Sequence, residues 1–389
     1  MGLSDSPLEL DAYQAFVVGT NRHKLVGEER LGFLLLGLFG EVGSLLSELK
    51  KKQRDQNAYF AYANSAREET GDVLWYLAAV VDHLGLRLGD VAGSVAHQTG
   101  NHVGRPLRYF VELQQQESLF QEPASTPHVQ RSLLRLAARA GRLVHRANSL
   151  ETDPDELKHD LVRIFDALVA AASDAHINLD RAAHENMGKI LDRWPIERIH
   201  TTLFDDAFDA DEQLPRRLEV TFREKEARGT KYVLQSVHGL HLGDRLTDNS
   251  ADADDYRFHD VFHLAYAAIL GWSPVLRSLL RLKRKSDRAV DEQQDGARAV
   301  ITEEGISNWI FAHGLRHQAF EAVESVDFAL LRTIRQMVRG YEVEICPLWM
   351  WEEAILQGFA AFRQLRAQRG GVVVADLQSR SLTYRASTP

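Results

Sequence analysis

Apolar residues recur at helical spacing through the first half of the chain. Residues 30–53 and 64–84 each place apolar residues at i, i+3, i+4 and i+7, which predicts two amphipathic helices. The same spacing predicts further helices at 9–26, 128–149, 154–175 and about 178–193. Between them, residues 86–127 are rich in Gly, Gln and Pro, which is typical of a short helix plus a connector. The pattern predicts an all-α first half.

The pattern changes after Pro195. Residues 218–222 and 231–237 alternate with period two on either side of Gly229, which predicts a β-hairpin. A second hairpin is predicted near the end of the chain, from 372–374 and 381–384. Between the hairpins, helical spacing predicts helices at about 257–271, 296–318, 326–340 and 349–368.

These elements predict the fold class and the domains. We expect a mainly α protein, in which a helical bundle is followed by an α+β domain with short β-hairpins. The bundle is expected at 1–196 and the α+β domain at 215–389. The acidic, loop-like residues between them, 197–214, are expected to form a linker.

Acidic residues interrupt the apolar pattern of residues 34–77. Glu41 and Glu48 lie about 20° apart on one helix face, and Glu69 and Asp72 share a face of the next helix. Carboxylates in apolar surroundings shift their pKa, pair with cations or bind a metal. This stretch is therefore the first candidate site.

A second helical pair resembles this stretch with its charge reversed. Residues 133–146 align with 35–48 without a gap, and Asp160 aligns with Asp72 in the helices that follow. The alignment sets Arg139, Arg142 and Arg146 on Glu41, Ser44 and Glu48. Either the chain contains an internal tandem repeat, or both stretches are ordinary amphipathic helices. In a repeat, the three guanidinium groups would face the carboxylates or the phosphates of a ligand.

Composition and charge exclude several function classes. The chain has 389 residues, enough for about two domains, and a net charge of −9, which argues against broad binding to duplex nucleic acid. Cys346 is its one cysteine, so there is no disulfide framework and no cysteine-based zinc site. No apolar run approaches the roughly 20 residues of a membrane span, and the first residues lack a signal pattern. We expect a cytoplasmic protein without a membrane or nucleic-acid partner.

Three short runs resemble the MazG-like all-α nucleotide pyrophosphohydrolase superfamily. Its pattern is Glu-x-x-Glu on one helix and Glu-x-x-Asp on the next. Residues 69–76, Glu-Thr-Gly-Asp-Val-Leu-Trp-Tyr, match the second half closely, and residues 40–44 match the first half except at Ser44. Residues 186–195 resemble the Asn-x-x-Lys helix of the family and its Arg-x-Pro end. The resemblance covers about 30–196.

The resemblance implies an enzyme that hydrolyses a nucleoside triphosphate to the monophosphate and pyrophosphate. Its cofactor would be Mg²⁺, with Mn²⁺ as the alternative, and a metal-activated water would attack the α-phosphorus. The metal-binding and catalytic residues implied are Glu41, Glu69 and Asp72. The implied phosphate contacts are Asn186, Lys189 and Arg193.

Ser44 departs from the family pattern, because a serine cannot supply the missing negative charge. Glu48, on the same face, is the candidate replacement ligand, and Glu68 could contribute by turning inward. The alternative for Glu48 is a surface acid paired with Lys51 or Lys52. Arg139, Arg142 and Arg146 are either phosphate contacts or structural partners of the acidic cluster.

The second half contains a less specific candidate site. His259 and His263 are four residues apart on one helix face, a spacing that can bind a metal. With Lys283, Lys285 and Glu304 they could form a second metal or phosphate site. The alternative is a pair of buried histidines hydrogen-bonded to acids beside a solvated basic loop. This half resembles the extra C-terminal domain of some MazG-like proteins, often linked to bacterial conflict systems.

Two questions about activity and assembly follow from the Ser44 departure and from the repeat. The rival to the enzyme is a non-catalytic nucleotide-sensing or interaction protein with a degenerate MazG-like site. Small MazG-like units assemble to complete their helical bundles, so we expect a homodimer, unless the internal repeat completes the bundle within one chain. The sequence names neither the base nor the sugar of the nucleotide.

Overall fold

The chain folds into two compact units, residues 1–194 and 195–389. The computed structural model describes residues 6–386, apart from 23, 99–106, 116–122 and 148–152. Most of the connector predicted within 86–127 therefore lies outside the described residues, although a helix at 88–98 agrees with the short helix expected there. The fold class is confirmed: the first unit is helical, and the second combines helices with one antiparallel sheet.

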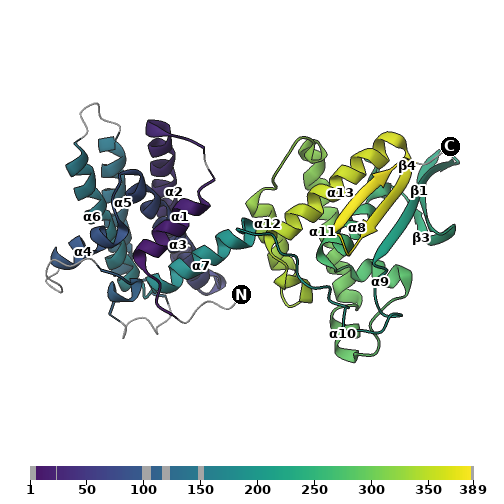
Figure 1. The fold of residues 1–389 in the computed structure, drawn as a ribbon, viewed down its shortest axis with the longest axis horizontal. Coiled ribbons are helices and arrows are strands. Elements are labelled where there is room, and N and C mark those ends of the chain that lie inside the picture. Colours follow the sequence, from purple (N-terminus) through teal and green to yellow (C-terminus); the bar gives the residue numbers. More distant parts are fainter. Residues whose placement is uncertain (1–5, 23, 99–106, 116–122, 148–152, 387–389) are drawn as a thin grey trace. The chain divides into compact units, whose positions relative to one another are not determined.

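The first unit is a helical bundle (Figure 1). Its helices are α1 (Leu10–Thr20), α2 (Gly27–Asp55), α3 (Tyr62–His83), α4 (Leu88–Gln98), α5 (Pro127–Ala147), α6 (Pro154–Asp174) and α7 (Leu179–Arg193). Two helical hairpins, α2–α3 and α5–α6, pack against each other through α2 and α5, and α7 packs on α3. Asp153 caps α6 just before Pro154, which confirms the predicted start of that helix.

The apolar stripe of α2 explains its place in the bundle. Leu34, Leu38, Val42, Leu45 and Leu49 recur every three or four residues, and all five are buried in the core of the first unit. By length and composition alone, the segment Gly27–Ala58 is apolar enough to cross a membrane. The expectation that no run reaches this length was therefore wrong.

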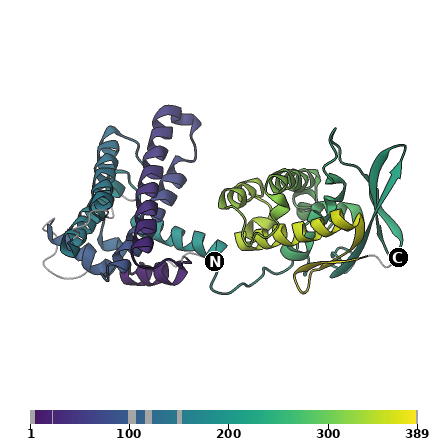
Figure 2. The ribbon, with the colours of Figure 1, turned by 90° about the horizontal axis from the view of Figure 1, so that it is seen from above.

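The second unit is built on a five-stranded antiparallel sheet (Figures 1 and 2). The strands are β1 (Arg217–Ala227), β2 (Thr230–Val237), β3 (Leu240–Leu246), β4 (Gly370–Asp376) and β5 (Ser381–Arg385), in the order β3-β2-β1-β4-β5. Both predicted hairpins are present, and they meet where β1 pairs with β4, with Val220 opposite Val373. Two segments far apart in the sequence thus form one sheet.

Helices complete the second unit. They are α8 (Asp260–Leu270), α9 (Pro274–Leu280), α10 (Arg288–Gln293), α11 (Ala297–Arg316), α12 (Phe328–Met337) and α13 (Leu348–Gln368). Helices α8 and α13 pack on each other and on β4 and β5. Every residue of α8 except Asp260 is buried, so this helix forms the centre of the core.

In three places the second unit differs from the sequence prediction or goes beyond it. Strand β3 and the short helices α9 and α10 were not predicted, because each is too short to show a clear period. The predicted linker, 197–214, packs on the second unit, where Asp205 is buried and its carboxylate lies 2.6 Å from Arg277 Nη2. The predicted solvated loop is anchored by buried Arg284, which pairs with Asp295 and Glu342.

Candidate functional site

Three carboxylates from two helices form the centre of the candidate site. Glu41 lies on α2, and Glu69 and Asp72 lie three residues apart on α3. One ligand oxygen from each residue lies within 4.8 Å of the others, and all three side chains are half-buried. The hairpin α2–α3 therefore assembles the three acids that were predicted to act together.

The electrostatics show that these acids repel one another. Burial raises the pKa of Glu69 to about 8, assisted by the charges of Asp72, Glu41 and Glu68. Burial and the charge of Asp72 also raise the pKa of Glu41. For Asp72, burial raises the pKa while the charge and hydrogen bond of Lys189 act against it. The cluster carries more negative charge than one lysine balances, so a divalent cation would stabilise it.

Helix α7 supplies the cation that faces the cluster. Lys189 Nζ lies 2.6 Å from Asp72 Oδ1 and 2.5 Å from Asp72 Oδ2. Asn186 donates from Nδ2 to Asp72 Oδ1 at 2.8 Å. Asn186 and Lys189, which the family resemblance implies as phosphate contacts, thus meet the cluster through Asp72.

Two further residues position this contact, and sequence reasoning missed them. The hydroxyl of Tyr13, a fully buried residue of α1, donates to Asn186 Oδ1 at 3.0 Å and so orients its amide toward Asp72. A Cβ at Gly71 would lie 2.8 Å from the carbonyl oxygen of Ala182 and 2.9 Å from Asn186 Cβ. Glycine therefore lets α7 approach α3 closely. The Gly71-Asp72 pair was visible in the sequence, but not the helix that it contacts.

Glu68 also lies at the cluster. Its Oε1 is 3.4 Å from Lys189 Nζ, and its charge contributes to the raised pKa of Glu69. Lys189 thus bridges Asp72 and Glu68 at the edge of the three central acids. The expectation that Glu68 could join the site agrees with this position.

Glu48 does not belong to the group formed by Glu41, Glu69 and Asp72. Its Oε1 is 2.5 Å from Lys51 Nζ, and its other oxygen accepts a hydrogen bond from Tyr59. The structure therefore gives Glu48 the lysine pairing that was the alternative to metal binding, although Glu48 is buried and not at the surface. The group of metal-competent acids found on α2 and α3 among the described residues does not include Glu48 or Ser44.

The arginine face contacts acids of its own hairpin. Arg139 Nη1 is 2.7 Å from Asp166 Oδ2, and Arg146 Nε is 2.7 Å from Asp160 Oδ2. Both arginines therefore have structural partners, but these partners are on α6 and not in the cluster on α2 and α3, where the structural role was expected. Arg142 is exposed.

Arg193 lies at the end of α7. Its guanidinium group stacks on the ring of Trp194, with Cζ 4.5 Å from the ring centroid. The role that the resemblance implied for Arg193, a phosphate contact, stays a prediction.

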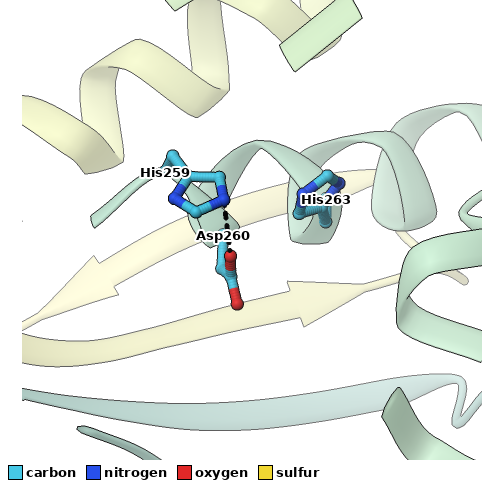
Figure 3. A group of neighbouring side chains, drawn as sticks. All are labelled: His259, Asp260 and His263. Carbon is cyan, nitrogen blue, oxygen red and sulfur yellow. Dashed lines mark ion pairs between the residues drawn. The ribbon is translucent and has the colours of Figure 1, made fainter. Parts of the chain in front are cut away.

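The second candidate site is also assembled, with a different membership. His259, Asp260 and His263 bring ligand atoms within 4.8 Å of one another (Figure 3). Glu304 Oε2 lies 3.5 Å from His263 Nε2. The group of possible metal ligands that the described residues form does not extend to Lys283 and Lys285, so their place in the site stays a prediction. Asp260 was missed, although it adjoins His259 in the sequence.

Comparison with known proteins gives the family. Residues 199–388 match the family described as the MazG C-terminal domain. The gene 37 protein of Mycobacterium phage L5 is 30% identical to the chain over 90 residues, which make up 22% of this chain and 79% of that protein. No solved structure matches. Its second unit matches the MazG C-terminal domain, and the chain belongs to the family of this phage protein.

Proposed function

We propose that the first unit hydrolyses a nucleoside triphosphate to the monophosphate and pyrophosphate. The observation that supports this most directly is the cluster of Glu41, Glu69 and Asp72, whose ligand oxygens lie within 4.8 Å of one another. It is supported further by the MazG relationship of the second unit. The resemblance of residues 30–196 to the MazG-like superfamily belongs to this proposal.

The cluster fits Mg²⁺, with Mn²⁺ as the alternative. Mg²⁺ prefers oxygen ligands, and carboxylates are the residues that the site offers. The raised pKa values of Glu41 and Glu69 mark a free-energy cost of burying like charges, which a divalent cation would remove. When bound, the metal would neutralise phosphate charge and activate the attacking water.

The side chains around the cluster take the remaining roles. A carboxylate of the cluster that is not fully committed to the metal could accept a proton from the attacking water as general base. Asn186 fixes the orientation of Asp72 through their 2.8 Å hydrogen bond. Lys189, which neutralises Asp72 and Glu68 in this structure, would also attract the phosphates of the nucleotide.

The proposal includes a homodimer in the cytoplasm. Leu36 and Phe39 of α2 are 73% and 46% exposed, and Leu134 of α5 is 52% exposed. Since α2 and α5 pack on each other, these side chains lie on neighbouring helices and support an interface there. Light scattering of wild type and Leu36→Lys tests this, because a charge in the interface should yield monomers.

Pyrophosphate release tests the proposed activity. The full chain is incubated with a panel of canonical and modified nucleoside triphosphates, with Mg²⁺ or Mn²⁺ and with a chelator. We expect pyrophosphate and monophosphate from at least one substrate, dependent on metal and lost in Asp72→Asn.

Two features of the site favour the alternative function, a non-catalytic nucleotide sensor. Ser44 lacks the carboxylate of the family pattern, and Lys189 contacts both oxygens of Asp72. A protein that binds nucleotides without releasing pyrophosphate from any substrate would be a nucleotide sensor, and this result would overturn the proposed hydrolase.

A further inference from the structure

Two histidines and two carboxylates of the second unit meet at the start of α8. His259 immediately precedes α8, and His263 lies one turn further along the same helix (Figure 3). His259 Nε2 is 3.1 Å from Asp260 Oδ1 and 3.9 Å from Glu304 Oε2. His263 Nε2 is 3.5 Å from that same Glu304 oxygen. The two Nε2 atoms therefore border one shared space.

Both imidazole rings are fixed through their other nitrogen. His259 Nδ1 lies 2.9 Å from the carbonyl oxygen of Tyr256, which can only accept, so this nitrogen donates. His263 Nδ1 lies 2.8 Å from Glu303 Oε1 and donates to that carboxylate. In each neutral ring Nε2 then has a free lone pair. This is the arrangement by which proteins orient metal-binding histidines.

His263 Nε2 has no hydrogen-bond partner within the described part of the chain, although it is fully enclosed. The side chain of His263 is 1% exposed, so water does not satisfy this atom from the surface. Buried polar atoms nearly always have a partner, and an exception calls for an explanation. A lone pair that faces the carboxylate oxygen of Glu304 needs a cation or a proton between them.

The groups behind the histidines are themselves held in place. Glu303 is fully buried and accepts from Ser273 Oγ at 2.6 Å and from the backbone N–H of Val275 at 2.8 Å. Gln235 of β2 donates to Asp260 Oδ2 at 2.5 Å, which leaves Asp260 Oδ1 toward His259. Residues from a strand and three helices thus fix the geometry before any ligand binds.

We propose that His259, His263, Asp260 and Glu304 bind a divalent transition metal ion of the zinc class. Zinc bonds of about 2.0–2.1 Å in a tetrahedral site place ligand atoms about 3.3 Å apart. The distances of 3.1, 3.5 and 3.9 Å among these nitrogen and oxygen atoms are close to that value. Imidazole ligands select zinc-class metals over Mg²⁺. Glu304, whose side chain is 43% exposed, leaves a path for the ion to enter.

Protonation is the competing explanation. Burial opposes a charge on His263, but the charge of Glu303 and the hydrogen bond to it, assisted by Glu304 and Asp260, outweigh burial and raise the pKa of His263. Burial lowers the pKa of His259, assisted by the charge of His263, although Asp260 and Glu304 oppose this. A proton on His263 would therefore still leave the His259 lone pair facing Asp260. One cation shared by both rings satisfies both nitrogens.

Zinc binding to the full chain tests the proposal. The protein is stripped with a chelator and titrated with Zn²⁺ by calorimetry in excess Mg²⁺, which would compete with Zn²⁺ for the carboxylate cluster of the first unit. X-ray absorption of the zinc-loaded protein then reports the ligands. We expect one site with two imidazole ligands, unchanged in Asp72→Asn.

Variants separate the site from non-specific binding. We expect His263→Gln to weaken Zn²⁺ binding at least about 100-fold, and Glu303→Gln by about 10–100-fold through loss of ring orientation. Glu304→Gln changes a partly exposed ligand and guards against misfolding of the buried variants. His313→Gln is the matched control, because His313 and His317 are also four residues apart and their rings lie 4.5 Å apart, but they are not in a metal-competent group of the described residues.

Two results would overturn the proposal. One is zinc binding that is equally tight in wild type, His263→Gln and Glu304→Gln. The other is the absence of a zinc site with imidazole ligands, together with NMR spectra in which added Zn²⁺ leaves the His259 and His263 ring signals unchanged. The second result would identify His263 as a buried imidazolium.

Discussion

The two units each gather charged side chains in the interior, but they do so with different chemistry. In the first unit three carboxylates share one lysine, and the cluster is half-buried. In the second unit two imidazoles alternate with carboxylates, and His259, Asp260 and His263 are more deeply enclosed. Oxygen ligands suit Mg²⁺, which keeps part of its water, whereas imidazoles suit zinc-class metals in drier sites.

The two clusters also differ in how the surrounding structure holds their charged side chains in place. The first cluster is assembled between helices, since Glu41, Asp72 and Lys189 come from α2, α3 and α7. The second is assembled mainly within one helical turn and is held by hydrogen bonds to Tyr256 and Glu303. We therefore expect the first cluster to depend on helix packing and on a cation, and the second to be preformed.

The largest expected effect compares two acids of α2. Glu41→Gln removes a carboxylate from the cluster and should lower Mg²⁺-dependent pyrophosphate release by about 100-fold or more. Glu48→Gln should leave the rate within about threefold, because Glu48 pairs with Lys51 and Tyr59. Steady-state kinetics of both purified variants measure the difference. An equal loss in Glu48→Gln would show that Glu48 acts as the replacement ligand after all.

The next effect concerns the one lysine of the cluster. Lys189→Met leaves Asp72 and Glu68 without their ammonium partner and should reduce the free energy of unfolding by about 2 kcal/mol in chelator. Adding Mg²⁺ should restore part of this loss, because an ion that binds the folded state stabilises it. Urea denaturation measures both.

Lys51→Met is the matched control for that lysine. Lys51 is more exposed than Lys189, so Lys51→Met should lower the free energy of unfolding by less than about 1 kcal/mol. If both variants lose the same stability, with no recovery in Mg²⁺, then the carboxylate cluster does not depend on a cation.

A smaller effect tests whether helix packing forms the first cluster. At Gly71 a new Cβ would meet Ala182 and Asn186, so Gly71→Ala should destabilise the fold by about 1–2 kcal/mol and lower activity. At Gly43, also within a helix, a Cβ would meet nothing within 4 Å. Gly43→Ala should therefore raise the free energy of unfolding by about 0.5–1 kcal/mol. Thermal unfolding of the two variants should therefore shift in opposite directions. A shift in the same direction would contradict close packing of α7 on α3.

The smallest effect is a dependence of the free energy of unfolding on pH. The pKa of Glu69 is about 8 in the folded protein, above the ordinary value of 4.5, so the folded state holds a proton that the unfolded state has lost. Its stabilising contribution is complete below about pH 4.5 and is lost as the pH rises through about 8. Because the cluster is partly solvated, we expect a change on the order of 1 kcal/mol.

Glu69→Gln isolates this contribution. Relative to wild type in chelator, the variant should gain stability between pH 5 and pH 8.5, as measured by urea denaturation at several pH values. Saturating Mg²⁺ should remove the difference in slope, since the metal favours the charged carboxylate. Parallel curves for the two proteins in chelator would show that Glu69 is already ionised at low pH.

The main elements of the fold could be predicted from the sequence because each has a clear period. The stripe from Leu34 to Leu49 identified α2, and alternation at 218–222 and 231–237 identified the first hairpin. The short elements β3, α9 and α10 could not be found in this way. Nor could local spacing show that Asp205, in the supposed linker, pairs with Arg277 inside the second unit.

For the candidate sites, the sequence by itself determined which side chains share a helix face. Helical spacing alone set Glu69 beside Asp72, Asn186 beside Lys189, and His259 beside His263. The predicted meeting of Glu41 with Glu69 and Asp72 rested on the family resemblance and is now seen in the described structure.

Tertiary structure alone decided which of these faces meet and with which partners. Glu48 lies on the same helix face as Glu41, yet its contacts are Tyr59 and Lys51. Arg139 and Arg146 likewise pair with acids of α6. Spacing fixes the direction of a side chain from its own helix, whereas its partner depends on how closely neighbouring helices approach. At Gly71 that approach depends on the absence of a single Cβ.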